Sequence, residues 1–331
     1  MNRKVKVSKC PPPPQECVGY PSILSQKDVT APHLEYNFFI DCEDGLESIA
    51  CSFICINHKK ERILLPSAST FADLIPYIQQ KKTPIIIVCH GLLSWRNQML
   101  ILHLAANLSK NLPCNTLRFD FIGNGHSSGS WRYASYNQDY YTLTSVIAFV
   151  NDVLQVPILC IVAHSRATCA VMKWSCSEHS MSLLRIPSIV NLSGRFHARS
   201  CDSIMTSRNQ KQELEKNGKF ELLRRGKLSY IVTASDVDEC SSYDMSSLNY
   251  DQINTRVLTI HGDCDRNVPV ENAFSFRDAL GTKHSLKIIE GADHNFNGLK
   301  YMSVLVDTIS SFIRKFDTDV THNKYESLKV I

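Results

Sequence analysis

Short apolar runs rich in β-branched residues alternate along most of the chain with longer segments of helical periodicity. Six such runs occur in order: "PIIIVCHG" (84–91), "NTLRFDF" (115–121), "ILCIVAHS" (158–165), "SIVNLSG" (188–194), "RVLTIHG" (256–262) and "SLKIIEG" (285–291). The segments of helical periodicity are 97–110, 136–152, 166–177, 270–280 and 299–315. Nearly continuous apolar strands between helices are typical of a mostly parallel sheet that is covered on both faces. We therefore expect an α/β fold.

The residues before the first run have a different pattern. Residues 34–64, "LEYNFFIDCEDGLESIACSFICINHKKERIL", alternate between apolar and polar positions and carry a turn signal at Asp44-Gly45, which predicts an antiparallel hairpin. A polar connection is expected from about 66 to 83. Residues 1–33 are expected to form an irregular arm. Its four consecutive prolines predict polyproline II structure, which serves either as a plain spacer or as a ligand for an SH3-type domain.

The alternation is interrupted once, between Gly194 and Arg256. This segment is richer in charge and tyrosine, and "FELLRRGKLSYIVT" within it predicts a hairpin. An insertion of this length indicates a cap above the carboxyl edge of the sheet, where open α/β folds bind ligands. The expected organisation is an arm (1–33), an α/β core in two parts (34–196 and 251–316), a cap (197–250) and a tail (317–331).

Composition adds several exclusions. Of the 331 residues, 44% are hydrophobic and 21% charged, and the net charge is +4, so the scattered basic excess does not indicate nucleic-acid binding. The 13 cysteines include no C-x-x-C pair, which argues against a zinc ribbon or a thioredoxin-type site. Neither a signal peptide nor an apolar stretch long enough for a transmembrane helix is apparent. We expect a cytoplasmic protein, and the oligomeric state is left open.

The run "ILCIVAHSRATCAVM" (158–172) places a serine between an expected strand and an expected helix. A nucleophile elbow needs small residues two positions before and two after its serine, because the turn brings neighbouring backbone close. Ser165 is flanked in this way by Ala163 and Ala167, where the common motif has glycines. The pentapeptide alone also fits a serine that only caps a helix.

The order of two later loops favours the nucleophile. On a sheet of this architecture, a serine nucleophile is followed along the chain by an acid and then by a histidine. "HGDCDRNVP" (261–269) follows the fifth run and carries both Asp263 and Asp265. "EGADHNF" (290–296) follows the last run and carries His294. All three residue types therefore fall at strand ends on one edge of the sheet.

An oxyanion formed at this edge would need two backbone N–H donors. The first is the residue after the nucleophile, Arg166, at a helix N-terminus whose dipole favours negative charge. The second is expected from the loop after the first run, where Leu92 follows His90 and Gly91. His90 is itself a candidate base, but its place beside the glycine indicates that it shapes this loop.

Five motifs in order, "IIIVCHGLLSWRNQ", "LRFDFIGNGHSSG", "VAHSRA", "LTIHGDCDRNVPVENA" and "IIEGADHNF", resemble signatures of the α/β-hydrolase superfamily. Within it the chain is similar to the branch of feruloyl and cinnamoyl esterases and monoacylglycerol-lipase-like proteins. The resemblance covers about residues 35 to 315, so the arm lies outside it. It implies that Asp265 is the acid and that Asp263 is structural. This sequence departs from the family pattern at the elbow, where two alanines replace the usual glycines.

The resemblance implies a serine hydrolase that cleaves carboxylic esters through an acyl-enzyme, with Ser165 as nucleophile, His294 as base and Asp265 as its partner. It would need neither a metal nor an organic cofactor. Small or aromatic esters are the first expectation. The alternatives are a lysophospholipase, a monoacylglycerol lipase or an acyl thioesterase, which would act on a lipid ester or thioester, and a non-catalytic binding protein. The cap decides among the substrates, and its candidate pocket residues are Phe220, Tyr230, Tyr243 and Tyr250.

Overall fold

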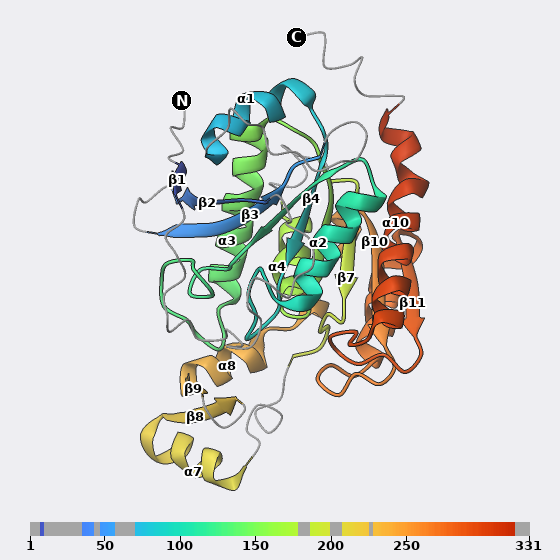
Figure 1. Cartoon of the computed structure of the whole chain (residues 1–331). Helices are drawn as coiled ribbons and strands as arrows, with labels where there is room; N and C mark the ends of the chain where they lie inside the picture. Colours follow the sequence, from blue (N-terminus) through green and yellow to red (C-terminus); the bar gives the residue numbers. More distant parts are fainter. Residues whose placement is uncertain are drawn as a thin grey trace.

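The computed structural model describes residues 7–9, 35–42, 47–56, 70–177, 186–198, 207–224 and 228–321. Within these residues, nine strands form one sheet in the order β1-β2-β3-β5-β4-β6-β7-β10-β11 (Figure 1). The strands are β1 (Val7–Lys9), β2 (Glu35–Asp41), β3 (Ser48–Ile54), β4 (Ile85–Cys89), β5 (Asn115–Phe119), β6 (Ile158–His164), β7 (Ser188–Leu192), β10 (Arg256–Gly262) and β11 (His284–Ile289).

Six neighbouring strands of this sheet, β5, β4, β6, β7, β10 and β11 in that order, pair in parallel, as the six apolar runs predict. The hairpin of β2 and β3 is antiparallel, and β3 joins the sheet antiparallel to β5. Every residue of β4, β5, β6 and β7 is buried, which explains why these strands appear in the sequence as continuous apolar runs rather than alternating ones. The expected α/β class is confirmed.

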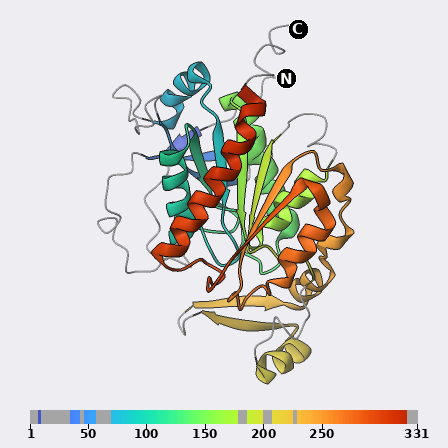
Figure 2. The same ribbon diagram turned by 90° about the vertical axis from the view of Figure 1, so that its right-hand side faces the viewer.

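Helices cover both faces of this sheet (Figures 1 and 2). On one face, α2 (Met99–Asn111) and α10 (Leu299–Thr321) pack against alternate strand residues such as Val88 and Val162. On the other face, α1 (Phe71–Lys81), α3 (Tyr136–Ala148), α4 (Ala167–Ser175) and α9 (Glu271–Leu280) pack against the intervening residues, such as Ile87 and Ile161. Two helical layers therefore hold the strand ends, and the loops after them, in fixed positions.

One helix lies where a polar connection was expected. Residues 71–81 form α1, which begins at a capping box in which the side chains of Thr70 and Asp73 each bond to the other's backbone N–H. Its residues Phe71, Leu74 and Ile78 are buried on one face. Pro76 is exposed on the other face of the helix, and the expectation of a polar connection was wrong for this segment.

The ends of the chain also differ from expectation. The first described residues, 7–9, form a short strand that pairs antiparallel with β2, so this part of the arm is not irregular. The rest of the arm, including its proline run, lies outside the described residues. Helix α10 continues to Thr321, past the expected start of the tail at 317, and residues 322–331 are not described.

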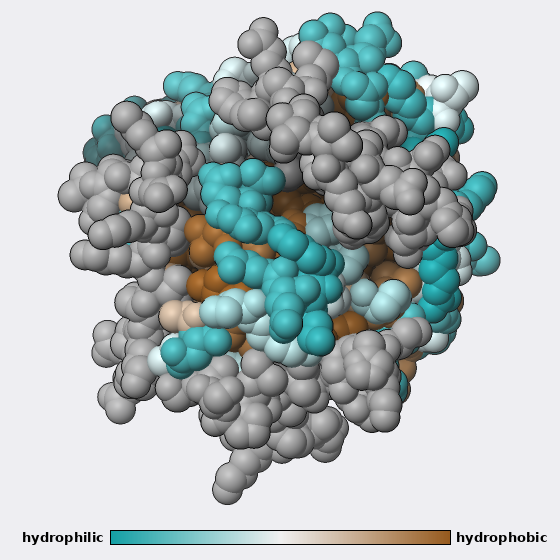
Figure 3. Space-filling model, turned by 90° about the horizontal axis from the view of Figure 1, so that it is seen from above, coloured by the Kyte–Doolittle hydropathy of each residue, from teal (hydrophilic) through white to brown (hydrophobic). Residues whose placement is uncertain are grey.

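Figure 3 shows the molecule from the end that is opposite to residues 219–233, and hydrophilic and hydrophobic residues both lie on this surface.

The segment between β7 and β10 contains the expected hairpin, formed by β8 (Lys219–Arg224) and β9 (Leu228–Thr233), together with α7 (Arg208–Asn217) and α8 (Ala234–Ser242). It lies at the lower end of the molecule in Figure 1. Two short 3-10 helices, Met245–Ser247 and Tyr250–Gln252, return the chain to β10. Apolar residues of the segment, Phe220, Val232, Val237 and Cys240, pack on Tyr133 and Ala134 of the core.

An ion pair and a hydrogen bond fix this contact. The Asp236 carboxylate accepts a hydrogen bond from the backbone N–H of Ala134 at 3.2 Å and one from the Arg132 guanidinium at 3.2 Å. Because Asp236 is also the N3 residue of the capping box that starts α8, the same carboxylate begins the helix and attaches it to the core. Within the described residues, no helix is both long and apolar enough to cross a bilayer.

Candidate active site

Ser165 lies in the tight turn between β6 and α4. Its φ of 55° is in the left-handed region, which a residue with a side chain adopts only when the surrounding structure holds it there. The backbone provides this support, because the Ser165 N–H donates to the Leu192 carbonyl at 2.8 Å and its carbonyl accepts from Thr168 N–H at 3.1 Å. The neighbouring residues Ala163 and Ala167 are fully buried.

Three side chains from three loops form one hydrogen-bonded row. The Oγ of Ser165 lies 3.0 Å from Nε2 of His294, and Nδ1 of His294 lies 2.7 Å from Oδ2 of Asp265. With the ring proton on Nδ1, His294 donates to the carboxylate, and its Nε2 is then free to accept the serine proton. The structure thus brings together the three residues that were predicted from motif order.

The Asp265 carboxylate is held in its charged form. Its side chain is fully buried, and burial alone would raise its pKa, but hydrogen bonds from His261 and His294 hold the pKa well below its usual range. Its other oxygen accepts from the backbone N–H groups of Asn267 at 2.8 Å and Val268 at 2.9 Å. Donors therefore surround both oxygens.

Asp263 has a different contact. Its carboxylate accepts the backbone N–H of Gly291 at 2.6 Å, which ties the loop after β10 to the loop after β11. The sequence carried two acids two residues apart, and the structure places only Asp265 beside His294.

The two expected oxyanion donors both border the cavity above Ser165. Arg166 precedes the first residue of α4, and Leu92 follows Gly91 in the loop after β4. A Cβ atom built on Gly91 would lie 2.9 Å from Cβ of Ser165. Only a glycine therefore allows the loop after β4 to lie this close to the serine.

His90 bonds to the backbone rather than to the cavity. Its Nε2 accepts the N–H of Phe121 at 3.1 Å, so Nδ1 carries the proton and donates to the carbonyl of Gly91 at 2.9 Å. Burial lowers the pKa of His90 to about 4, which keeps the ring neutral. These contacts agree with the expectation that His90 shapes the loop.

Two supporting side chains were not predicted. His164 Nε2 donates to the backbone carbonyl of His294 at 2.9 Å, and burial lowers the pKa of His164 to about 3. The guanidinium of Arg166 is buried and pairs with Asp139 at 2.8 Å, while it also donates to the Tyr133 carbonyl at 3.0 Å. Despite Arg166, burial raises the pKa of Asp139 to about 6. The spacing of these residues along the chain does not predict the contacts, because the contacts join elements that are far apart in the sequence.

A cavity of about 710 Å³ opens above the row. Core loops provide Ser165, His294 and the residues around them, and the inserted segment provides Leu222, Cys240, Tyr243 and Met245. Of the four aromatic candidates only Tyr243 lines this cavity, where its ring stacks on Tyr136 with centroids 4.0 Å apart. Tyr230 is not in the lining, and its ring packs against that of Trp131.

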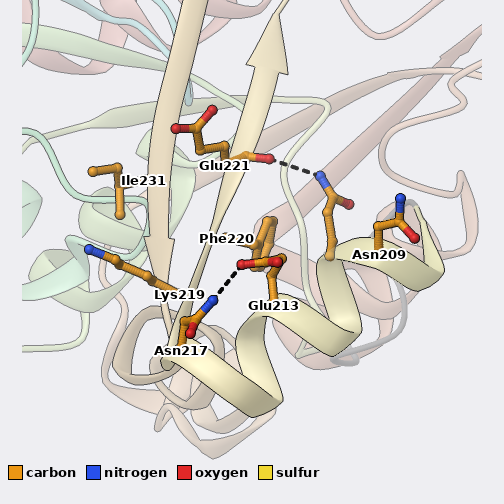
Figure 4. A pocket seen from close by; sticks show the side chains of 8 residues that line it. Asn209, Glu213, Asn217, Lys219, Phe220, Glu221 and Ile231 are labelled. Atoms are coloured by element: carbon orange, nitrogen blue, oxygen red, sulfur yellow. Dashed lines mark hydrogen bonds between the residues drawn. The ribbon is translucent and has the colours of Figure 1, made fainter.

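A second hollow, of about 690 Å³, lies on the inserted segment itself, between α7 and β8 (Figure 4). Its walls are mostly polar, and two hydrogen bonds connect them: Asn217 to Glu213 at 2.6 Å and the Gln210 side chain to the Glu221 carbonyl at 3.1 Å. It lacks the serine–histidine–aspartate row, so the cavity above Ser165 is the candidate active site. Among the described residues, no group of three or more His, Cys, Asp or Glu side chains could hold a metal ion.

Comparisons with known proteins agree with this architecture. A family model described as the prolyl oligopeptidase family matches residues 227–317, a range that includes Asp265 and His294. The uncharacterized protein YDL057W of Saccharomyces cerevisiae is 24% identical over 242 residues, which cover 66% of this chain and 71% of the yeast protein.

Two solved structures are similar over most of the chain. Mouse alpha/beta hydrolase domain-containing protein 10 has a TM-score of 0.62 at 16% identity and covers 85% of this chain and 99% of its own. The Est1E protein of Butyrivibrio proteoclasticus, solved with ferulic acid bound, has a TM-score of 0.59 at 17% identity and covers 84% and 98%. The chain therefore has the fold of the α/β-hydrolases.

Proposed function

We propose that the chain is a serine hydrolase that cleaves carboxylic esters through an acyl-enzyme intermediate. The observation that carries this proposal is the row from Ser165 through His294 to Asp265, with distances of 3.0 and 2.7 Å, at the floor of a cavity. A serine that only capped α4 would not need a histidine at its hydroxyl or a buried carboxylate behind that histidine. The row gives the serine a base and the base an orienting anion.

The proposed reaction has two steps. In the first, Oγ of Ser165 attacks the ester carbonyl carbon while Nε2 of His294 takes its proton, and the carbonyl electron pair moves onto oxygen. When the tetrahedral intermediate collapses, the C–O bond to the alcohol breaks and His294 protonates the leaving oxygen. In the second step, a water molecule loses a proton to His294, attacks the acyl carbon and releases the acid and the serine hydroxyl. Asp265 stabilises the imidazolium in both steps.

The developing oxyanion is proposed to bind the backbone N–H groups of Leu92 and Arg166. The close contact between Gly91 and Ser165 supports this assignment, because it brings the loop that carries Leu92 next to the nucleophile. Arg166 lies at the start of α4, where the helix dipole also favours negative charge.

Small or aromatic esters are the proposed substrates. Tyr136 and Tyr243, whose rings stack on each other, both line the cavity, and aromatic side chains in a lining suit an aromatic acyl or alcohol group. The fold is also similar to that of a protein solved with ferulic acid bound. Lipid esters and thioesters are the competing substrates, and a series of 4-nitrophenyl esters of increasing chain length separates the two groups.

The nucleophile is tested with a fluorophosphonate probe and with hydrolysis of 4-nitrophenyl butyrate. Ser165→Ala should abolish labelling and lower kcat/KM by several orders of magnitude, as removal of a triad serine does. Ser175→Ala is the matched control, because Ser175 is a buried serine of helix α4 whose hydroxyl donates to the Met172 carbonyl. It should label normally. Labelling of the Ser165→Ala protein at the wild-type rate would exclude Ser165 as the nucleophile.

A non-catalytic binding protein is the remaining alternative. It predicts that the wild-type chain itself fails to react with the probe and fails to hydrolyse any ester of the series. The partial match to the prolyl oligopeptidase family raises the question whether amide bonds are also cleaved. Hydrolysis of a 4-nitroanilide, compared with the 4-nitrophenyl ester of the same acid, answers it.

A further inference from the structure

The charged side chains that line the cavity above Ser165 are all arginines. They are Arg166, Arg195 and Arg266, and no aspartate or glutamate is among the described residues of the lining. A mildly basic chain would be expected to contribute both signs to a surface of this size, because it has 36 basic and 32 acidic residues. The one-sided lining is therefore a property of this site.

The three arginines are not equivalent. Arg166 is buried and forms an ion pair with Asp139 at 2.8 Å, so its charge is compensated inside the protein. Arg195 follows the end of β7 and Arg266 follows Asp265, and both belong to loops at the mouth of the cavity. Arg195 is half-buried and Arg266 is exposed. The charge that a ligand can reach is therefore concentrated at the mouth.

Arg195 is held in place at this mouth. Its Nη2 donates to the backbone carbonyl of Asn267 at 2.6 Å, which positions the guanidinium beside the loop that carries Asp265 and Arg266. Arg195 and Cys169 both line the cavity, and the charges of Arg166 and Arg195 oppose the increase in pKa that burial causes at the Cys169 thiol.

Nearby carboxylates are already engaged. Asp265 is fully buried and bonded to His294, and Asp244 accepts the backbone N–H groups of Ser246 at 2.7 Å and Ala198 at 3.5 Å. Within the described part of the chain, Arg266 forms no ion pair with a carboxylate.

We propose that the substrate cleaved at Ser165 carries a negatively charged group, a carboxylate or a phosphate, that binds Arg195 and Arg266 at the mouth of the cavity. The inference rests on the proposed function and narrows its substrate class. Guanidinium groups suit both anions because their N–H donors match pairs of oxygens. The anionic group takes no part in the chemistry: water and the ester become an acid and an alcohol, and the charged group stays on whichever product carried it.

Two matched pairs of esters test the inference and distinguish the position of the charge. Mono-4-nitrophenyl glutarate and 4-nitrophenyl pentanoate differ by a terminal carboxylate in the acyl part. 1-Butyrylglycerol 3-phosphate and 1-butyrylglycerol differ by a phosphate in the alcohol part. For at least one pair, the wild-type protein should show a kcat/KM about tenfold or more higher for the anionic member, as a charge-assisted contact implies. That preference should decrease as sodium chloride screens the arginines.

The variants are Arg195→Gln, Arg266→Gln and the double substitution, and the readout is the ratio of kcat/KM for the anionic and neutral members of a pair. The ratio should fall about tenfold in the double variant. Arg314→Gln is the matched control, because Arg314 is an exposed arginine whose Nη2 donates to a backbone carbonyl, that of Asn111, at 2.9 Å. It lies on α10, and its loss should leave the ratio unchanged.

The outcomes separate this inference from the proposed function. If the probe labels Ser165 but neither pair shows an anionic preference, or if the double variant keeps that preference, the anion site is wrong and the hydrolase stands. If labelling fails, the proposed function is wrong. Calorimetry with 1-butyrylglycerol 3-phosphate and mono-4-nitrophenyl glutarate on Ser165→Ala protein then decides whether the anion site exists. Binding that the added Arg195→Gln and Arg266→Gln substitutions weaken would support the site, and absence of binding would overturn it.

Discussion

Replacing Asp265 by asparagine should remove most of the activity while the fold survives. One oxygen of Asp265 accepts two backbone N–H groups, from Asn267 and Val268, and the other faces the ring nitrogens of His294 and His261. If the amide oxygen of asparagine replaces the first oxygen, its NH₂ group points at the two rings. His294 must then accept at Nδ1 and carry its proton on Nε2, where it can no longer accept the serine proton.

The opposite amide orientation is no better, because it aims the NH₂ group at two backbone donors. The substitution should therefore lower kcat/KM about 10⁴-fold, the loss that a wrong tautomer causes in a serine triad, which corresponds to about 5.5 kcal/mol of barrier. Asp263→Asn is the matched control. Its amide oxygen can still accept the N–H of Gly291, so kcat/KM should stay within about fivefold, the factor that corresponds to the roughly 1 kcal/mol contribution of one such hydrogen bond.

The two variants are compared by kcat/KM for 4-nitrophenyl butyrate and by the rate of fluorophosphonate labelling. Thermal unfolding of each protein shows whether it is folded. A larger loss from Asp263→Asn than from Asp265→Asn would show that the wrong acid has been assigned. Activity of the Asp265→Asn protein within tenfold of wild type would refute the argument from the tautomer of His294.

Three further predictions follow from single contacts. Tyr243→Ala removes one of the two stacked rings that line the cavity and should change the ratio of kcat/KM between aromatic and long-chain esters severalfold, whereas Tyr230→Ala, outside the lining, should lower stability and leave that ratio unchanged. Glu35→Gln leaves the fully buried Arg118 without the carboxylate it pairs with at 2.8 Å and should lower the free energy of unfolding by about 2 kcal/mol in urea denaturation. Burial lowers the pKa of His90 from 6.5 to about 4, so between these values only the unfolded chain binds that proton. The contribution of neutral His90 to the stability of the folded protein is therefore lost as the pH falls from 6.5 to about 4. The midpoint of thermal unfolding should be lower at pH 5 than at pH 7, and this difference should be smaller in His90→Gln.

The sheet could be predicted because its central strands are buried on both faces. A strand such as Ile85–Cys89 has no solvated side, so every position is apolar and the run is visible without any alignment. Helix α1 was not predicted because its buried residues Phe71, Leu74 and Ile78, although they have helical spacing, lie among polar residues, and the segment therefore has the composition of a polar connection. Thr70 and Asp73 had the spacing of a capping box, and that start signal could have located the helix.

The row of the candidate site could be predicted because its order along the chain follows from the topology. Each member lies on a loop after a parallel strand, and parallel strands end at one edge. The supporting contacts could not be predicted in this way. His164 reaches the carbonyl of His294 across 130 residues of sequence, and Arg195 bonds to Asn267 from a loop with no motif of its own. Such contacts depend on the side-chain directions at neighbouring strand ends, which spacing does not determine.

The two alanines of the elbow show where glycine is needed in this turn. Ala163 is the sixth residue of β6 and Ala167 the first of α4, and neither has a positive φ, whereas Ser165 between them does. An alanine is therefore unstrained at both positions. The glycine that the turn does require is Gly91, because a Cβ there would lie 2.9 Å from Cβ of Ser165. Since the next residue, Leu92, is the proposed oxyanion donor, the same close contact that excludes a side chain at Gly91 also sets the distance between nucleophile and donor.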